Sequence, residues 1–245
     1  MESSVKLFDV SFMISAFPRI LAALPVTLEL TVVSAFFGLL LGFGLALVKI
    51  NKPRILTPIC SFFVSFMRGT PQLVQLFLAY YGLPLVVKSL NASLGTSLNI
   101  NNIPAIVYAF VAFSLNESAY FSENIRAAIL SVDRKEIEAA KSIGMTGAQT
   151  MLRIVLPEAM VVAVPNLGNS IISLLKGTSL AYTVTIMDVM GAAKAVAGRN
   201  MRYFEVYIAV SLVYWACSLI LERLAHIIEK KTNILEKKVP DHAES

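Results

Sequence analysis

An apolar run from Ile20 to Val48, interrupted by a single charged residue, Glu29, constrains this chain more than any other feature. About 20 apolar residues suffice for a helix to cross the hydrocarbon core of a bilayer. The whole chain shares this bias, because 56% of its 245 residues are hydrophobic and only 15% are charged, whereas soluble domains average about 25% charged residues. A soluble domain of this size cannot bury so much apolar surface. The composition therefore excludes an ordinary soluble enzyme and indicates an integral membrane protein.

We predict an all-α, polytopic membrane protein that folds as a single domain over residues 1–245, with five transmembrane helices. The predicted spans are 20–48, 72–88, 103–125, 159–175 and 204–228. The apolar segment 55–67 precedes a break at 68–72, and we interpret it as an interfacial helix or a half-span. The less apolar segment 179–190 is a candidate re-entrant or interfacial segment.

The basic residues predict the orientation of these spans. Most of the 21 Lys and Arg residues fall between spans one and two, between spans three and four, or after span five. Because basic residues collect in cytoplasmic loops, we expect the N-terminus outside and the C-terminus in the cytoplasm. The same tendency accounts for the net charge of +5. No basic patch is interleaved with aromatic residues, so we expect no nucleic-acid partner.

The predicted cytoplasmic segment 133–157 carries two helix-start signals. Each is a capping pair with a polar N-cap residue and an acidic or amide residue three positions later. The pairs are Asp133 with Glu136 and Thr146 with Gln149. They predict helices over 134–143 and 147–156, with Gly144 ending the first of them. The expected product is a helix–turn–helix elbow that projects from the membrane.

The same segment contains Glu138-Ala139-Ala140, then Gly144 after three residues, then Ile154-Val155-Leu156-Pro157 after nine more. This spacing resembles the EAA-loop signature of permease subunits of ATP-binding-cassette importers, a type I importer permease fold. In that family the loop docks into a cleft on the ATPase subunit. The resemblance implies that Glu138 is an exposed anchor, that Ala139 and Ala140 permit close approach, and that Gly144 supplies the bend. The alternative is an ordinary amphipathic loop with a glycine turn.

Further stretches narrow the resemblance to polar amino-acid permeases. They are Pro25–Thr31, Phe66–Phe77, Ser118–Arg126 and Lys176–Leu180. The chain departs from the family pattern at Lys135-Glu136, where Gly-Gln is usual, and at Ala127-Ala128, where a glycine pair is usual. These changes bear on loop flexibility or on the matching ATPase. The segment Met187–Gly191, together with 198–200 and 203–207, looks most like cystine permeases, with glutamine, arginine, histidine or opine importers as alternatives.

Five residues are candidates for the substrate path. An ionisable group near the centre of a membrane costs at least ~2.5–3.5 kcal/mol, so it requires a partner or a function. Glu117, beside Asn116 in the third span, is a candidate for binding a substrate amino group, or else for pairing with Arg68 or Lys176. Lys176 and Thr178 are candidates for binding a substrate carboxylate. Arg68 precedes a broken-helix signal, which is typical of transport sites or of a membrane-entry corner.

Other residues have structural interpretations. Glu123 and Arg126 lie three positions apart, which predicts an ion pair on one helix face. Gly38 and Gly42 form a GxxxG pair, which predicts close helix packing within one subunit or between two. Glu29 is a weaker candidate for the substrate path, with a helix–helix contact as the alternative.

The motifs that the sequence lacks also bear on function. It has no GxxxxGK[ST] motif, so we expect ATP and Mg²⁺ to bind a partner ATPase rather than this chain. No catalytic or metal-binding constellation is evident, and Cys60 and Cys217 are interpreted as free thiols. The resemblance implies a bacterial plasma membrane, two cytoplasmic ATPase subunits, an identical or similar permease and an external solute-binding protein. A secondary transporter or a membrane-anchored interaction protein remains the alternative.

Overall fold

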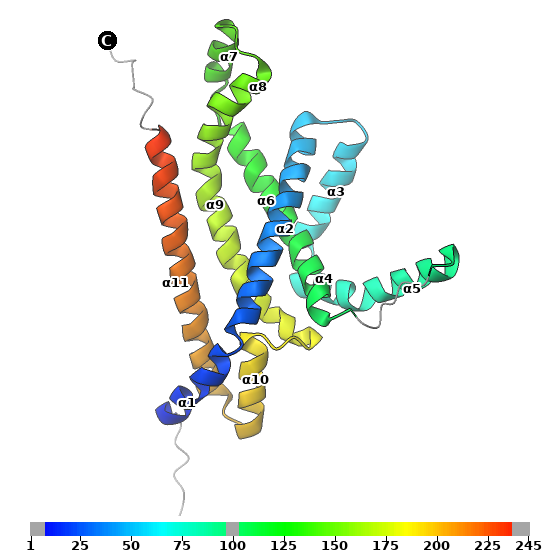
Figure 1. The fold of residues 1–245 in the computed structure, drawn as a ribbon, viewed down its shortest axis with the longest axis vertical. Coiled ribbons are helices and arrows are strands. Elements are labelled where there is room, and N and C mark those ends of the chain that lie inside the picture. Colours follow the sequence, from blue (N-terminus) through cyan, green and yellow to red (C-terminus); the bar gives the residue numbers. More distant parts are fainter. Residues whose placement is uncertain (1–7, 97–102, 237–245) are drawn as a thin grey trace, which may run out of the picture.

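The computed structural model describes residues 8–96 and 103–236, and every regular element in these ranges is helical (Figure 1). The all-α prediction is therefore confirmed. In chain order the elements are α1 (Val10–Leu21), α2 (Leu24–Asn51), α3 (Leu56–Gly69), α4 (Gln72–Phe77), the π-helix η1 (Leu78–Gly82), α5 (Leu83–Leu94), α6 (Ala105–Leu130), α7 (Arg134–Ser142), α8 (Gly147–Thr150), the π-helix η2 (Met151–Val155), α9 (Leu156–Gly177), the 3₁₀-helix η3 (Thr178–Val184), α10 (Val189–Asn200) and α11 (Tyr203–Glu236).

Helices α2 and α6 form the centre of the bundle, and two glycines allow their close approach. A Cβ placed on Gly38 would lie 3.0 Å from the Cβ of Glu117, and one on Gly42 would lie 2.8 Å from the Cβ of Phe121. Such distances leave no room for a larger residue. The GxxxG pair therefore packs two helices of the same chain, which decides between the two interpretations drawn from the sequence.

Four helical stretches among the described residues are long and apolar enough to cross a membrane. They are Leu24–Asn51, Gln72–Leu94, Gly147–Val184 and Tyr203–Thr232. The remaining predicted span, 103–125, falls in α6, whose 26 residues correspond to about 39 Å of helix. Because α6 carries Asn116, Glu117, Glu123 and Arg126, no stretch of 18 residues within it is as apolar as the best stretch of each of those four. The count of five spans stays a prediction.

Several predicted boundaries differ from the helix ends. The first predicted span begins at residue 20, but Ile20 belongs to α1, and a turn at 22–23 separates it from α2. Pro25 lies in the first turn of α2, where a missing N–H costs nothing. The fourth and fifth predicted spans lie inside longer helical stretches, because a helix continues beyond the apolar region whenever its polar ends are solvated. The segment 179–190 contains most of η3 and the start of α10.

The second predicted span, 72–88, lies in the helical stretch Gln72–Leu94, which is long and apolar enough to cross a membrane. We interpreted 55–67 as an interfacial helix or a half-span, and this segment forms most of α3, which packs alongside α2 and α6. Helix α5 extends sideways from the bundle (Figure 1) and buries none of its residues. Hydropathy reports the length of an apolar helix and not its direction, so the sequence does not predict how α5 lies.

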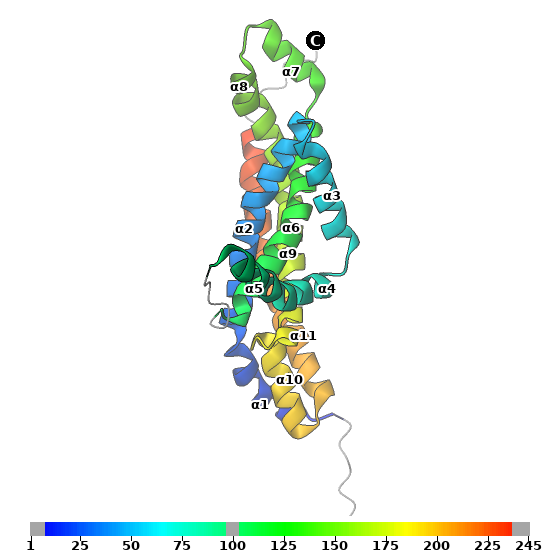
Figure 2. The ribbon, with the colours of Figure 1, turned by 90° about the vertical axis from the view of Figure 1, so that its right-hand side faces the viewer.

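The two ends of the bundle carry different elements (Figure 2). Helices α7 and α8 project beyond one end. At the other end α1, α10 and α11 pack together around a small apolar core. The central residues of that core include Ile20, Val189, Ala193 and Val206. The middle of the molecule, between these ends, holds the polar residues described next.

Candidate functional site: a projecting elbow and a polar cleft

The first arm of the elbow is α7, which the sequence predicts over 134–143. The carboxylate of Asp133 accepts a hydrogen bond from the backbone N–H of Lys135 at 2.9 Å. Asp133 is thus the N-cap as predicted, but its partner is at the second helical position rather than at Glu136. Gly144 has a φ of 86°, in the left-handed region that glycine adopts without strain. The predicted bend at Gly144 is confirmed.

The second arm begins with the predicted capping box. The backbone N–H of Gln149 donates to Thr146 Oγ1 at 3.3 Å, and the backbone N–H of Thr146 donates to Gln149 Oε1 at 2.8 Å. From Gly147 the chain stays helical through α8, η2 and α9. Pro157 lies in the first turn of α9 and causes no break. Because the arm is continuous with α9, a displacement of the elbow reaches the bundle directly.

The residues of the EAA signature divide between the surface and the interior of the elbow. Glu138, Ala139, Gly144, Leu156 and Pro157 are exposed, whereas Ala140 is only 2% exposed. Ala140 therefore packs inside its own elbow, whereas Ala139 lies on the surface. Two large apolar side chains beside the signature face outward: Ile143 is 80% exposed and Leu152 is 65% exposed. The elbow thus exposes both a carboxylate and apolar side chains.

A cleft of about 470 Å³ lies where the break between α3 and α4 meets α6 and α9. All of its lining side chains carry a polar group, which is unusual within an apolar bundle. They are Thr70, Gln72, Asn116, Glu117, Tyr120, Asn124, Asn166, Asn169, Ser170 and Ser173. Asn124 Nδ2 donates to Ser170 Oγ at 2.9 Å and so joins α6 to α9 in the wall of the cleft.

Glu117 is the carboxylate of the cleft, and only 5% of it is exposed. Its Oε2 accepts no hydrogen bond, and no ion pair joins Glu117 to a basic side chain anywhere in residues 8–96 and 103–236. The alternative pairing with Arg68 or Lys176 is therefore absent from the structure. Burying an unpaired carboxylate is costly, so Glu117 needs either a proton or a positively charged partner that enters the cleft.

The other sequence candidates lie elsewhere. Arg68 stands beside the cleft, with its guanidinium 5.5 Å from the centre of the Tyr120 ring. Lys176 is exposed and does not line the cleft. Thr178 is fully buried and donates its hydroxyl hydrogen to the carbonyl of Leu175 at 2.7 Å. The cleft thus brings together Asn116 and Glu117, places Arg68 next to them, and leaves out Lys176 and Thr178.

Gln75 is a buried polar residue that the sequence analysis did not single out. Its Oε1 accepts a hydrogen bond from Asn116 Nδ2 at 2.8 Å. Its Nε2 donates to the carbonyl of Met67 at 2.8 Å and to Thr70 Oγ1 at 2.8 Å. The broken helix was the one signal in the sequence that pointed to Gln75, because the last carbonyls of a helix need hydrogen-bond donors from outside the helix.

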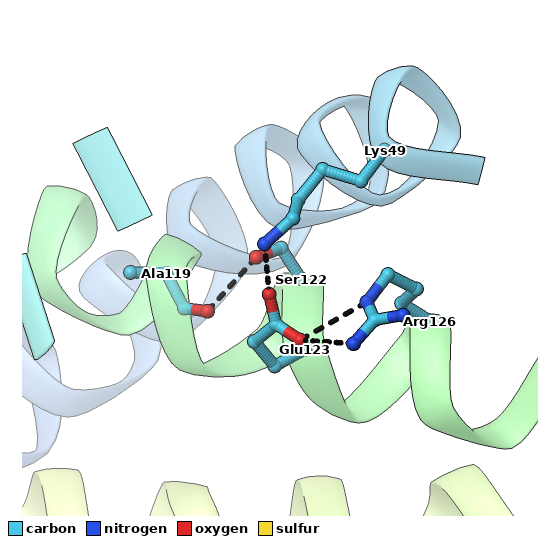
Figure 3. A network of polar contacts seen from close by, with 5 residues as sticks. All are labelled: Lys49, Ala119, Ser122, Glu123 and Arg126. Carbon is cyan, nitrogen blue, oxygen red and sulfur yellow. Dashed lines mark hydrogen bonds and ion pairs between the residues drawn. The ribbon is translucent and has the colours of Figure 1, made fainter. Parts of the chain in front are cut away.

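An ion cluster joins α2 to α6 near the elbow (Figure 3). Arg126 donates to Glu123 from Nε at 3.0 Å and from a terminal guanidinium nitrogen at 2.9 Å, so the predicted ion pair is confirmed. Lys49, at the end of α2, approaches the other oxygen of the same carboxylate. This third member is 74 positions away in the sequence, too far for a helical spacing rule to find.

Comparisons with known proteins agree with this arrangement. The probable amino-acid permease protein YxeN of Bacillus subtilis (strain 168) is 42% identical over 206 residues, which are 84% of this chain and 88% of that protein. The L-cystine transport system permease protein TcyL of the same organism is 40% identical over 209 residues, which are 85% of each chain. A chain in a crystal structure of an amino acid ABC transporter with histidines is 32% identical, with a TM-score of 0.79.

That alignment covers 92% of this chain and all of the solved one. Residues 13–234 also match a family of transporter membrane subunits as a whole. The match includes the bundle, the cleft and the elbow, and it extends over far more than half of the sequence. The chain therefore belongs to the family described as binding-protein-dependent transport system inner membrane component, and within it to the permeases of amino-acid ATP-binding-cassette transporters.

Proposed function

We propose that the polar cleft is the path by which an ATP-driven importer moves a polar amino acid, with L-cystine as the first candidate. The observation that carries this proposal is the buried Glu117, whose Oε2 has no hydrogen-bond partner and whose side chain lines a cleft together with other polar side chains. An amino acid supplies the ammonium group that such a carboxylate binds. Amide and hydroxyl groups around the cleft suit the remaining polar atoms of the substrate.

The choice of L-cystine rests on similarity in sequence. The segment Met187–Gly191 resembles cystine permeases, and TcyL is 40% identical over 85% of this chain. Glutamine, arginine, histidine and opines are the alternatives, because their importers share the same family. Each of these compounds carries an amino or guanidinium group that suits Glu117, so the carboxylate alone does not select among them.

We infer that the elbow couples this movement to ATP hydrolysis on two separate ATPase subunits. The exposed Glu138, together with Ala139, Gly144, Leu156 and Pro157, contacts the ATPase. ATP closes the ATPase pair and draws two elbows together, one from each permease of a two-fold assembly. Because the second arm continues into α9 without a break, this motion rocks the bundle between inward-open and outward-open states. This subunit catalyses no chemical reaction.

The proposed assembly is completed by an external solute-binding protein and by an identical or similar permease. It lies in a bacterial cell membrane, with the N-terminus outside and the C-terminus in the cytoplasm. The distribution of Lys and Arg among the loops supports this orientation. It also places the elbow on the side where ATP is available.

The test is uptake of radiolabelled amino acids by proteoliposomes that contain the complete complex, with L-cystine, glutamine, arginine, histidine and an opine compared directly. We expect ATP-dependent uptake of L-cystine above the others, and at least about tenfold weaker uptake in Glu117→Gln. Glu29→Gln is the matched control, because Glu29 is exposed on α2 and does not line the cleft. Uptake that persists without ATP contradicts the coupling, and an unchanged Glu117→Gln variant contradicts the path.

A further inference from the structure

The break between α3 and α4 leaves backbone carbonyls that must find donors. Helix α3 ends at Gly69, Thr70 and Pro71 are extended, and proline has no N–H to offer. Thr70 Oγ1 donates to the carbonyl of Phe66 at 2.8 Å. Gln75 Nε2 supplies the carbonyl of Met67 at 2.8 Å and that of Thr70 at 3.2 Å. The side chain of Gln75 thus closes the break from the first turns of α4.

These carbonyls fix which way the amide of Gln75 points. A backbone carbonyl only accepts hydrogen bonds, so the group that faces Met67 and Thr70 must be the NH₂ of Gln75. Its oxygen must then face α6, where Asn116 lies at 2.8 Å. Since Gln75 Oε1 also only accepts, Asn116 must present its own NH₂ to that oxygen. The orientation of both amides follows from the backbone and not from an arbitrary assignment of O and N.

The second hydrogen of the same Asn116 nitrogen is also engaged, because Nδ2 lies 3.3 Å from the carbonyl of Met67. An amide nitrogen has two hydrogens, so neither remains for a ligand. Asn116 is 5% exposed and lines the cleft beside Glu117. The group that Asn116 can offer to the cleft is therefore its oxygen, an acceptor, next to the carboxylate oxygens of Glu117.

We propose that Gln75 is a positioning residue that sets the polarity of the substrate cleft. It holds Asn116 so that Asn116 and Glu117 form a pole of acceptors, which binds the ammonium group of an amino acid and rejects its carboxylate. Gln75 does not line the cleft, but it bonds two residues that do, Asn116 through its oxygen and Thr70 through its nitrogen. This inference rests on the proposed function, because it assumes that an amino acid occupies the cleft.

The hydrogen bond between Gln75 and Asn116 has a clear consequence for selectivity. Without Gln75 Oε1, the amide of Asn116 is held only by its longer hydrogen bond to the carbonyl of Met67 at 3.3 Å, so it turns more easily and offers N–H to the cleft more often. A ligand that lacks an ammonium group then loses less binding affinity at this end of the cleft. Replacing Gln75 by methionine keeps nearly the same side-chain length and removes Oε1 together with the Nε2 that supplies the carbonyls of Met67 and Thr70. Selectivity for the ammonium group is therefore the readout that reports on Asn116.

The test uses the complete complex in nanodiscs and the radiolabelled amino acid that the uptake panel identifies. Bound label is competed by two derivatives of that amino acid: its methyl ester, which keeps the ammonium, and its N-acetyl form, which lacks it. We expect the methyl ester to compete at least about tenfold better, as for sites that reject a missing polar group. In Gln75→Met we expect this ratio to fall toward one. Asn200→Ala is the control, because Asn200 bonds a carbonyl in α10, away from the cleft.

A second measurement needs no ligand. If acceptors surround these amides as described, Asn116→Asp lowers the unfolding temperature of the complex more than Asn116→Ala does. Gln75→Glu likewise lowers it more than Gln75→Met, because the carboxylate oxygen in the place of Nε2 faces the carbonyl oxygens of Met67 and Thr70. The exchange variant Gln75→Asn/Asn116→Gln keeps two amides across the same gap. In the competition experiment we expect it to recover much of the wild-type ester-to-acetyl ratio.

The outcomes separate the two proposals. An unchanged ester-to-acetyl ratio in Gln75→Met, while Glu117→Gln alters binding, overturns the role of Gln75 and leaves the cleft as the path. A complex that neither binds nor transports any amino acid of the panel overturns the proposed function and with it the selectivity argument. If Asn116→Asp and Gln75→Glu are as stable as Asn116→Ala and Gln75→Met, the hydrogen-bond arrangement between Gln75 and Asn116 is overturned.

Discussion

Gly42 and Phe121 are in such close contact that a Cβ on the glycine would stand 2.8 Å from the Cβ of the phenylalanine and 2.9 Å from the carbonyl oxygen of Ser118. Gly38, one turn earlier, meets Glu117 in the same way. The helix that carries the cleft carboxylate is therefore held directly against α2. Since Phe121 is almost fully buried, neither helix can move away without breaking this contact.

We predict that Gly42→Ala destabilises the protein by about 1–3 kcal/mol, because the added methyl group forces α2 and α6 apart. Gly44→Ala is the matched control on the same helix, since a Cβ there meets nothing within 4 Å. Thermal unfolding of the purified complex measures both. Equal unfolding temperatures for the two variants would show that the contact does not hold the helices.

The ion cluster at Glu123 predicts an unequal response to the loss of its members. Glu123→Ala leaves two cations without their shared partner, whereas Arg126→Ala leaves the contact between Lys49 and Glu123 in place. We expect Glu123→Ala to cost about 1–3 kcal/mol more than Arg126→Ala, since Glu123 and Lys49 are mostly buried.

The exposed pair of His226 and Glu229 serves as the control for that cluster. Glu229→Ala should change stability by less than about 1 kcal/mol. Chemical unfolding of the four proteins gives the comparison. A Glu123→Ala variant that is as stable as Arg126→Ala contradicts the shared-partner interpretation.

The capping box predicts a local effect in the elbow. Thr146→Ala removes the acceptor for the N–H of Gln149, and we expect this change to cost about 0.5–2 kcal/mol of local helix stability. Thr146→Ser keeps the hydroxyl and should behave like the wild type. Hydrogen exchange over α8 measures the difference. Equal protection in the alanine and serine variants argues against the cap.

Asp188 predicts a dependence on pH. This N-cap of α10 lies outside the candidate spans, is fully buried, and accepts from the N–H of Gly191 at 2.8 Å. Burial raises the pKa of Asp188 from its ordinary value of 3.8 to about 6, although hydrogen bonds to Gly191 and Met190 lower it in part. Between these two values the folded protein holds more protons than the unfolded one.

The free energy of unfolding therefore falls as pH rises from about 4 to 6, and this contribution is largest at low pH. Asp188→Asn removes the titrating group while it keeps an oxygen for the cap. We expect the difference in stability between wild type and variant to change across that window and to be constant above it. A difference that stays constant from pH 4 to pH 7 contradicts the raised pKa.

Short-range features of this chain were predictable, and long-range ones were not. The Thr146–Gln149 box, the bend at Gly144 and the Glu123–Arg126 pair each depend on residues within a few positions, where helix geometry fixes which groups meet. Lys49 reaches Glu123 from another helix, and no local rule identifies it. The direction of α5 also escaped prediction, because it depends on packing rather than on hydropathy.

The cleft was predictable only in part. Asn116 and Glu117 were evident because polar residues in an apolar helix need a reason. Lys176 and Thr178 follow the apolar part of α9, but neither enters the cleft. Lys176 is exposed, and Thr178 is buried with its hydroxyl bonded to the carbonyl of Leu175. Gln75 looked like one more polar residue after a broken helix. Its importance became visible only when three helices placed Met67, Thr70 and Asn116 around it.

The central claim is that this permease works through a separate ATPase that binds its elbow, and affinity purification of the tagged chain from its own membrane in mild detergent tests it most directly. Mass spectrometry of the purified material identifies what binds the chain. The account predicts a soluble protein with a GxxxxGK[ST] motif in stoichiometric amount, lost in Glu138→Arg but kept in the control Gly44→Ala. Purification of the chain without any ATPase, or equal retention of the ATPase by Glu138→Arg, would contradict it.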